Sequence, residues 1–214
     1  MSYLTIKDIG ESQFEEKKSI FIGKAIGVGT EVEAKKILNK IKRENKGARH
    51  NVYAYILGEN NSIQRYSDDG EPQGTGGMPI LEIIKRNNLT DVVVVVTRYF
   101  GGILLGTGGL TRAYTKVATE SLKQATTVLK VEGCELIIKL DYELLGKVQH
   151  NCQLKNWVIE NIVYTDKVEL SIFSEINNVE LIIDTIKNIT SARCEIQTCG
   201  QGIYFKNEKK LYKL

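Results

Sequence analysis

The chain has 214 residues, 42% of them hydrophobic and 26% charged, which suffices for the core of one large domain or two small ones. The valine run Val92–Val96 is far too short to span a membrane, and residues 1–21 contain no apolar segment of a secretory signal. The sequence therefore predicts a cytoplasmic protein without a membrane segment.

The four cysteines are Cys134, Cys152, Cys194 and Cys199, and their spacing matches neither a metal site nor a disulfide framework. We expect ordinary reduced thiols, with a redox pair of Cys194 and Cys199 as the alternative.

The net charge of +3 is unevenly distributed along the chain. Residues 1–131 hold 19 Lys and Arg against 14 Asp and Glu, whereas residues 132–214 hold 10 against 12. A basic first half points to an anionic partner, and an ordinary solvated surface is the alternative.

An α/β domain is predicted for residues 1–131. Thr30 followed by Glu33 is typical of a capping box, and apolar residues at helical spacing follow it. Val92–Val96 lacks polar alternation, which predicts a strand buried on both faces. In chain order we expect strand Phe21–Val28, a helix from Thr30, strands Val52–Leu57 and Ile63–Tyr66, a helix starting at Pro79, strand Asp91–Tyr99 and a helix over Leu110–Ala125.

A ferredoxin-like domain is predicted for residues 132–214, because its elements follow a βαββαβ order. We expect strand Glu135–Leu140, helix Tyr142–Leu154, strands Trp157–Tyr164 and Val168–Phe173, helix Asn178–Asn188, strand Arg193–Thr198 and a basic tail at residues 206–214. The fold class is therefore α+β, with two domains that meet at residue 131.

Two glycine-rich segments, residues 67–79 and 97–114, are the most distinctive feature of the chain. Nine of its 19 glycines lie between Gly70 and Gly109. Glycines gather where the backbone takes unusual φ angles or approaches another group closely.

These segments also carry a family resemblance. Residues 67–79 read S-D-D-G-E-P-x-G-T-x-G-x-P, and residues 96–114 read V-T-R-Y-F-G-G-x-L-L-G-x-G-G-L-x-R-A-Y. Together with H-N-x-Y-A-Y at residues 50–55 and Y-x-x-x-G-K-V-Q-H at residues 142–150, they resemble the IMPACT family and its bacterial YigZ-like branch.

The resemblance implies a first domain like domain 2 of a small-subunit ribosomal protein, and a second like the C-terminal domain of elongation factor G. Eukaryotic members of the family regulate translational stress signalling through a kinase-activating partner. Because this chain carries the bacterial-type second domain, that pathway is not transferred to it.

The second segment could hold a phosphate. A glycine loop that opens a helix exposes unpaired N–H groups, and arginines add bidentate contacts. Aromatic residues between the arginines would suit stacking on unpaired bases, with half-buried sheet tyrosines as the alternative. The candidate residues for binding RNA or phosphate are Gly106, Gly108, Gly109, Thr111, Arg98, Arg112, His50 and Arg65.

The first segment carries three carboxylates, Asp68, Asp69 and Glu71. They could order the loop, contact a partner or bind a divalent cation, although the spacing does not fit an EF-hand. Arg98 and Arg112 are expected to emerge at one edge of the domain. Alternatively, either arginine pairs with one of the carboxylates and ties the two segments together.

No nucleophile and base stand at a catalytic spacing, since the two histidines, His50 and His150, are 100 residues apart. The P-loop pattern is also missing. We expect no catalytic residues, no metal and no cofactor, and hypothesise a non-enzymatic RNA- or ribosome-binding regulator of translation. The alternative is an enzyme or sensor that binds a nucleotide or phosphorylated small molecule at the glycine-rich loops.

Overall fold

The computed structural model describes residues 2–207 and 210–213. The chain divides into two compact units, Tyr3–Val128 and Leu129–Leu214, the latter together with Met1–Ser2. The division falls inside strand β7 (Thr127–Leu140), three residues before the expected boundary. The fold is α+β, as predicted.

The first unit is built on a five-stranded antiparallel sheet whose central strand is the valine strand. The strand order is β2-β3-β6-β4-β5. The strands are β2 (Gly10–Glu16), β3 (Ser19–Gly27), β4 (His50–Leu57), β5 (Ile63–Ser67) and β6 (Val92–Tyr99).

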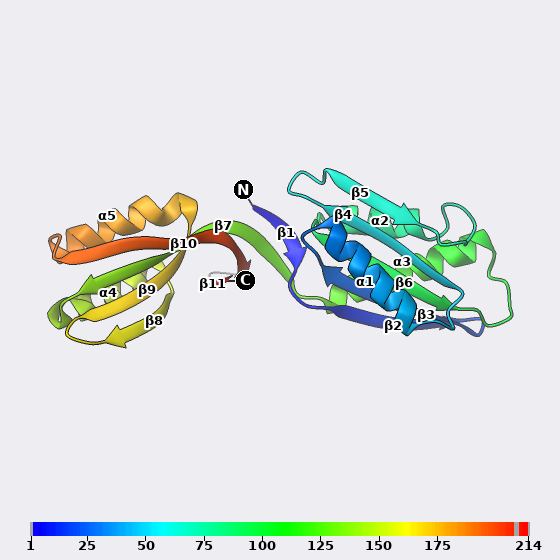
Figure 1. Ribbon diagram of the computed structural model, residues 1–214, viewed down its shortest axis with the longest axis horizontal. Helices are drawn as coiled ribbons and strands as arrows, with labels where there is room; N and C mark the ends of the chain where they lie inside the picture. The colour runs from blue at the N-terminus through cyan, green and yellow to red at the C-terminus, as the bar shows by residue number, and fades with distance from the viewer. Residues whose placement is uncertain (1, 208–209, 214) are drawn as a thin grey trace. The chain divides into compact units, whose positions relative to one another are not determined.

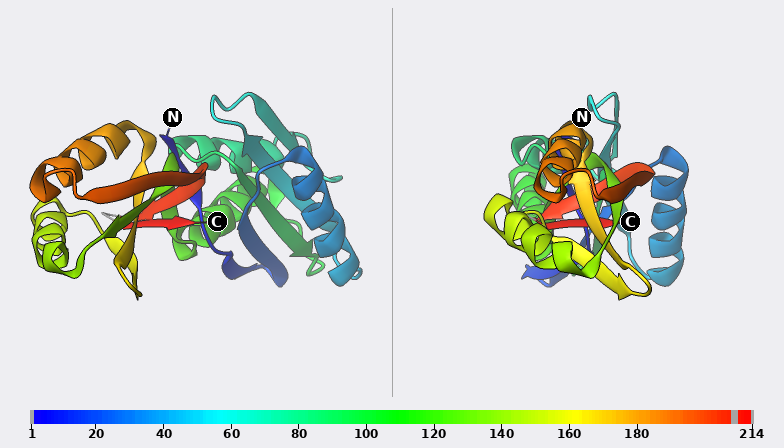
Figure 2. Two further views of the ribbon diagram at one scale, coloured as in Figure 1. Left: turned by 60° about the vertical axis from the view of Figure 1, so that its left-hand side comes forward. Right: turned by 90° about the vertical axis from the view of Figure 1, so that its left-hand side faces the viewer.

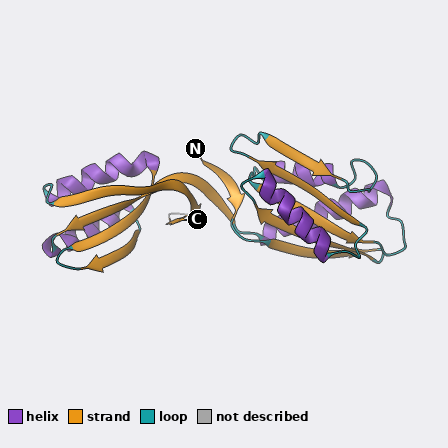
Figure 3. Ribbon diagram, in the orientation of Figure 1, coloured by secondary structure: helices purple, strands orange, loops and turns teal. Residues whose placement is uncertain are grey.

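Both faces of this sheet are covered by helices, as Figures 1 and 3 show. Val93 and Val95 pack in a cluster with the apolar side of α1 (Glu31–Glu44). The alternate residues Val92, Val94 and Val96 pack in a second cluster with α2 (Gly77–Arg86) and α3 (Gly106–Gln124). Successive side chains of a strand point to opposite faces, so burial of all five valines confirms the predicted two-sided strand.

Two helix starts of the first unit, those of α2 and α3, differ from the predicted ones. Helix α2 begins at Gly77, which places Pro79 third in the helix, where its missing N–H still costs no intrahelical bond. Helix α3 begins at Gly106 and not at Leu110, so Gly106, Gly108 and Gly109 of the second segment form its first turn. The polar stretch before Phe21 forms two unpredicted strands, β1 (Ser2–Ile6) and β2.

The second unit has the predicted ferredoxin-like order of elements. Its strands follow the order β11-β10-β7-β9-β8. Helices α4 and α5 lie side by side over one face of the sheet (Figure 2). The remaining elements are α4 (Tyr142–Lys155), β8 (Ile159–Tyr164), β9 (Val168–Glu175), a 3-10 turn (Ile176–Asn178), α5 (Val179–Thr190), β10 (Cys194–Asn207) and β11 (Lys210–Lys213).

The expectation of a basic tail is corrected in part. Lys210–Lys213 form β11, which pairs antiparallel with the end of β10. Leu211 is buried in a small cluster with Val131 and Tyr204, which holds β11 against the sheet. Residues 208, 209 and 214 of the expected tail lie outside the described residues.

Within the described ranges, no helix combines the length and apolar character needed to cross a membrane. All four cysteines are free thiols, and burial raises the pKa of Cys152 to about 11.

Removing the N-cap of α1 should destabilise the first unit. Thr30 Oγ1 accepts a hydrogen bond from the Glu33 N–H at 3.2 Å, while Glu33 Oε2 accepts one from the Gly29 N–H at 2.7 Å. We expect Thr30→Ala to lower the free energy of unfolding by about 1 kcal/mol and Thr30→Ser by much less, in urea titrations followed by circular dichroism. Equal losses in the two variants would contradict the capping role.

Candidate functional site

Asp68 holds the first glycine-rich segment to the start of α2. Its Oδ1 accepts hydrogen bonds from the N–H groups of Gly76 and Gly77 at 3.0 and 2.8 Å, and its Oδ2 accepts one from Gly74 at 2.9 Å. A carboxylate at this position satisfies free amides and complements the helix dipole. The N-terminus of α2 is therefore already occupied by an anion from the chain itself.

Asp69 links the same segment to β4 and α1. Its Oδ2 accepts from the Asn51 N–H at 2.7 Å, and its Oδ1 accepts from Lys42 Nζ at 2.8 Å. The Asp69 carbonyl oxygen lies 2.8 Å from His50 Nδ1, so that nitrogen is the donor and His50 Nε2 faces the other way. The Asp69 carboxylate is therefore also bound by groups of the chain itself.

Glu71 is the centre of a buried polar cluster. Its Oε1 lies 2.6 Å from Arg98 Nη1 and 2.7 Å from the Tyr114 hydroxyl, which donates to it. His50 Nε2 lies 3.9 Å from the same oxygen. The side chains of Glu71 and Arg98 are only 4% and 5% exposed, so the pair is withdrawn from water.

The surroundings of this cluster keep its members in place. The Arg98 guanidinium donates to Ser19 Oγ at 3.3 Å and lies over the rings of Phe21 and Phe100, 5.3 and 5.4 Å from their centroids. Burial, followed by the charge of Glu71, raises the pKa of Tyr114. The hydroxyl therefore stays protonated at neutral pH and remains a donor.

Two of the glycines are required by close packing beside this cluster. A Cβ on Gly77 would lie 2.8 Å from the backbone of Ser67, and a Cβ on Gly101 would lie 2.1 Å from the carbonyl carbon of Lys18. Gly108 differs, because a Cβ there would meet only the end of the Arg112 side chain at 3.7 Å.

The structure brings part of the predicted set together. His50, Asp68, Asp69, Glu71 and Arg98 meet around the first segment, as the contacts above describe. Arg98 does not emerge at the edge as expected, because it is buried and paired with Glu71, which is the alternative arrangement named above.

The other predicted residues lie elsewhere. Arg65 is exposed on β5, with its Nε 3.9 Å from Glu31 Oε1 of α1, and does not join the glycine-rich segments. Gly106, Gly108, Gly109, Thr111 and Arg112 form the first two turns of α3.

The N-terminus of α3 differs from that of α2, where the Asp68 carboxylate accepts hydrogen bonds from the backbone amides. Within the described part of the chain, no side chain caps its N-terminus at Leu105, and the Thr111 hydroxyl donates to the Thr107 carbonyl oxygen at 3.1 Å. Arg112 is exposed and has no ion-pair partner among these residues. Free amide donors and an unpaired guanidinium thus lie on one helix end.

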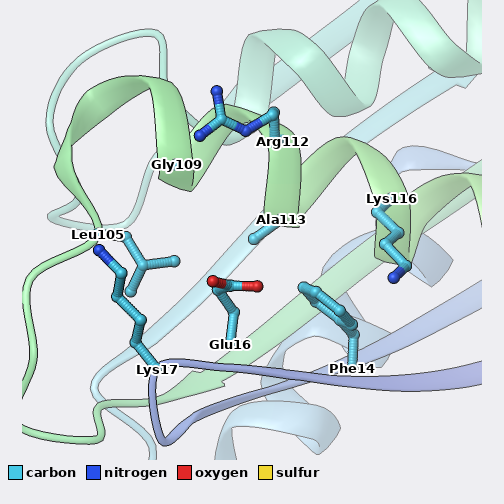
Figure 4. A pocket seen from close by; sticks show the side chains of 8 residues that line it. All are labelled: Phe14, Glu16, Lys17, Leu105, Gly109, Arg112, Ala113 and Lys116. Atoms are coloured by element: carbon cyan, nitrogen blue, oxygen red, sulfur yellow. The ribbon is translucent and has the colours of Figure 1, made fainter.

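A cavity of about 270 Å³ lies beside these turns. Figure 4 shows Phe14 and Glu16 directed from β2 towards α3, and Lys116 Nζ lies 3.8 Å from the centroid of the Phe14 ring. The cavity lining contains three cations and one carboxylate. The lining residues are Phe14, Glu16, Lys17, Leu105, Gly109, Arg112, Ala113 and Lys116.

Sequence reasoning missed the contribution of β2 to this cavity. Phe14 is an isolated aromatic residue in the polar stretch Gly10–Glu16, which has no polar and apolar alternation to predict a strand. The residues near Phe14 in the sequence do not indicate which helix its side chain faces.

No metal centre is formed by the carboxylates of the first segment. In residues 2–207 and 210–213, no group of three or more His, Cys, Asp or Glu side chains is placed to hold a metal ion. Asp68, Asp69 and Glu71 point to three different sets of internal partners.

Comparison with known proteins agrees with the two-domain division. Residues 17–122 match the family described as Impact N-terminal domain, and residues 138–193 match a domain of unknown function, DUF1949. The IMPACT family member YvyE of Bacillus subtilis is 38% identical over 196 residues, which cover 92% of this chain and 90% of that protein.

Two further relatives extend the likeness. The IMPACT family member YigZ of Escherichia coli is 36% identical over 137 residues, or 63% of this chain and 67% of that protein. A solved crystal structure of a hypothetical protein is 29% identical, covers 91% of this chain and 96% of its own, and superposes with a TM-score of 0.62. The chain therefore belongs to the IMPACT family and is similar to its YigZ-like members.

The two arginines of the second segment should respond differently to removal. Arg98→Ala leaves the Glu71 carboxylate buried without its cation, and we expect the first unit to lose about 3–5 kcal/mol of stability. Arg112→Ala removes an exposed side chain and should change stability by less than about 0.5 kcal/mol.

Urea titrations of both variants, followed by circular dichroism, test this difference. Equal stability losses in Arg98→Ala and Arg112→Ala would show that burial of the Arg98–Glu71 pair has no energetic consequence.

Proposed function

We propose that the chain binds single-stranded RNA, free or in the ribosome, through the first turns of α3, and that it regulates translation without catalysing a reaction. The observation that carries this proposal is the open N-terminus of α3 beside three cations, Lys17, Arg112 and Lys116. Helix N-termini bind phosphates through free amides and the helix dipole.

The chemistry of this surface suits an unpaired strand. Basic side chains provide phosphate contacts, and two aromatic rings lie near them, Phe14 at the cavity and Phe100, 36% exposed. Each ring already has cations over it, Lys116 over Phe14 and Arg49 and Arg98 over Phe100, so a base that stacks there joins or displaces these cations. Gly108 adds to this, because the space above it is open and a backbone can approach closely. The glycine is there without a packing requirement of the kind found at Gly77 or Gly101.

Membership of the IMPACT family supports the proposed role in translation. The chain belongs to the IMPACT family, and the resemblance of its two domains to components of the translation machinery favours a role in translation. His50, Asp68 and Asp69 act on the first glycine-rich segment, which leads into α2. The connection to α3 is made by Glu71, which pairs with Arg98 and accepts a hydrogen bond from Tyr114 of α3.

A second candidate function rests on the cavity itself. A volume of about 270 Å³ beside phosphate-binding groups would admit part of a nucleotide or a phosphorylated small molecule, although ligand pockets usually begin at about 300 Å³. A thermal-shift screen with nucleotides and sugar phosphates separates the candidates. A specific shift with one of them, without RNA binding, favours the small-molecule site.

Neutralising the α3 surface should weaken RNA binding. We expect Arg112→Gln with Lys116→Gln to lower affinity for a single-stranded RNA and to reduce the slope of log K against log salt by about 0.7 for each lost phosphate contact. Filter binding at several salt concentrations measures both quantities.

The matched control is Lys85→Gln with Lys123→Gln, which removes the same charge from exposed positions on α2 and α3. An unchanged slope in the α3-surface variant, or the same change in the control, would refute the assignment of this surface.

A further inference from the structure

Helix α1 carries an exposed basic face that the proposed function has not used. Residues 35–49 hold seven Lys and Arg against one Glu, a local charge of +6 in a chain whose net charge is +3. We call Lys36, Asn39, Lys40 and Arg43 the α1 basic stripe.

The stripe lies opposite the buried side of the helix. Ala34, Leu38 and Ile41 pack against the sheet, whereas all four stripe residues are exposed. Lys36, Lys40 and Arg43 follow one another at intervals of four and three residues. Such neighbours stand about 5–6 Å apart on a helix surface, so their charges form a line parallel to the helix axis.

These cations are largely free of internal partners. Among the residues described, Lys36 and Arg43 form no ion pair, and the contact of Lys40 with Glu44 is long, at 3.9 Å. Lys42, by contrast, is held by Asp69 at 2.8 Å. The stripe surrounds a shallow hollow of about 410 Å³, lined by its four members and Glu44.

The positive charge continues past the end of the helix. Lys46 and Arg49 are both exposed, and the Arg49 guanidinium lies over the Phe100 ring, 5.2 Å from its centroid. Exposed cations therefore continue from the middle of α1 to Arg49, which lies beside Phe100.

We infer that the α1 basic stripe binds the phosphate backbone of double-stranded RNA without reading its sequence. Lysine, arginine and asparagine are typical phosphate-contacting side chains, and duplex RNA is recognised mainly through its shape and backbone. The stripe itself contains no aromatic residue, which disfavours an unpaired strand, whose bases need stacking partners. This inference rests on the proposed function in taking RNA as the anionic partner.

The stripe and the α3 surface form two separate contacts. Helix α1 packs on Val93 and Val95, and α3 packs in the cluster of Val92, Val94 and Val96, on the opposite face of β6. A structured RNA with a duplex next to an unpaired segment could engage both.

The test is the variant Lys36→Gln/Lys40→Gln/Arg43→Gln, compared with the control Lys85→Gln/Arg86→Gln/Lys123→Gln on α2 and α3. Glutamine retains a high helix propensity, and circular dichroism checks that both variants are folded. We expect the stripe variant to bind a 20-base-pair RNA about tenfold or more weakly, with a salt slope reduced by about 0.9 for each lost contact, the value for B-form DNA. The control should keep the wild-type affinity and slope.

Three outcomes would overturn the inference. They are wild-type duplex affinity in the stripe variant, an equal loss in the control, and binding of wild-type protein to vesicles with 30% phosphatidylserine but not to duplex RNA. A single-stranded RNA is titrated in parallel. If its binding falls in Arg112→Gln with Lys116→Gln while duplex binding is unaffected by the stripe variant, only the α1 inference fails. If wild-type protein binds neither RNA, the proposed function fails as well.

Discussion

The buried ion pair between Glu71 and Arg98 is the constraint on which the arrangement of the first unit depends. It joins the first glycine-rich segment to the end of the valine strand, and Tyr114 joins α3 to the same carboxylate oxygen. Charges in such a position must be closely partnered, because removing them from water is costly. The segments around them pack tightly, and Gly77 and Gly101 are two positions where an added Cβ would clash with the backbone of another segment.

This constraint changes the meaning of the charged residues in the family motifs. Asp68 occupies the N-terminus of α2, Asp69 holds Asn51 and Lys42, and Glu71 holds Arg98, so these groups organise the fold. Groups that remain available to a partner lie outside that network. They are the open start of α3 with Arg112 and the basic face of α1, on opposite sides of one sheet.

Local patterns in the sequence were enough to predict much of the fold. The valine run predicted the central strand, and the order of elements after residue 132 predicted the ferredoxin-like unit, because periodicity and burial act over a few neighbouring residues. Which of Arg98 and Arg112 pairs with a carboxylate could not be predicted, since both arginines flank the same glycines and only tertiary packing buries Arg98. Strand β2 was missed for a related reason, because its single apolar residue, Phe14, has its partner on α3, about 100 positions further along the chain.

A double-mutant cycle between Glu71→Gln and Arg98→Met tests the central role of the ion pair most directly. Urea unfolding of the wild type, the two single variants and the double variant yields a coupling free energy, and a cycle of Glu71→Gln with Arg112→Met serves as the reference. We predict a coupling of about 1–3 kcal/mol for Glu71 with Arg98, and additivity within about 0.5 kcal/mol for Glu71 with Arg112. Additive effects in the first cycle would contradict the account.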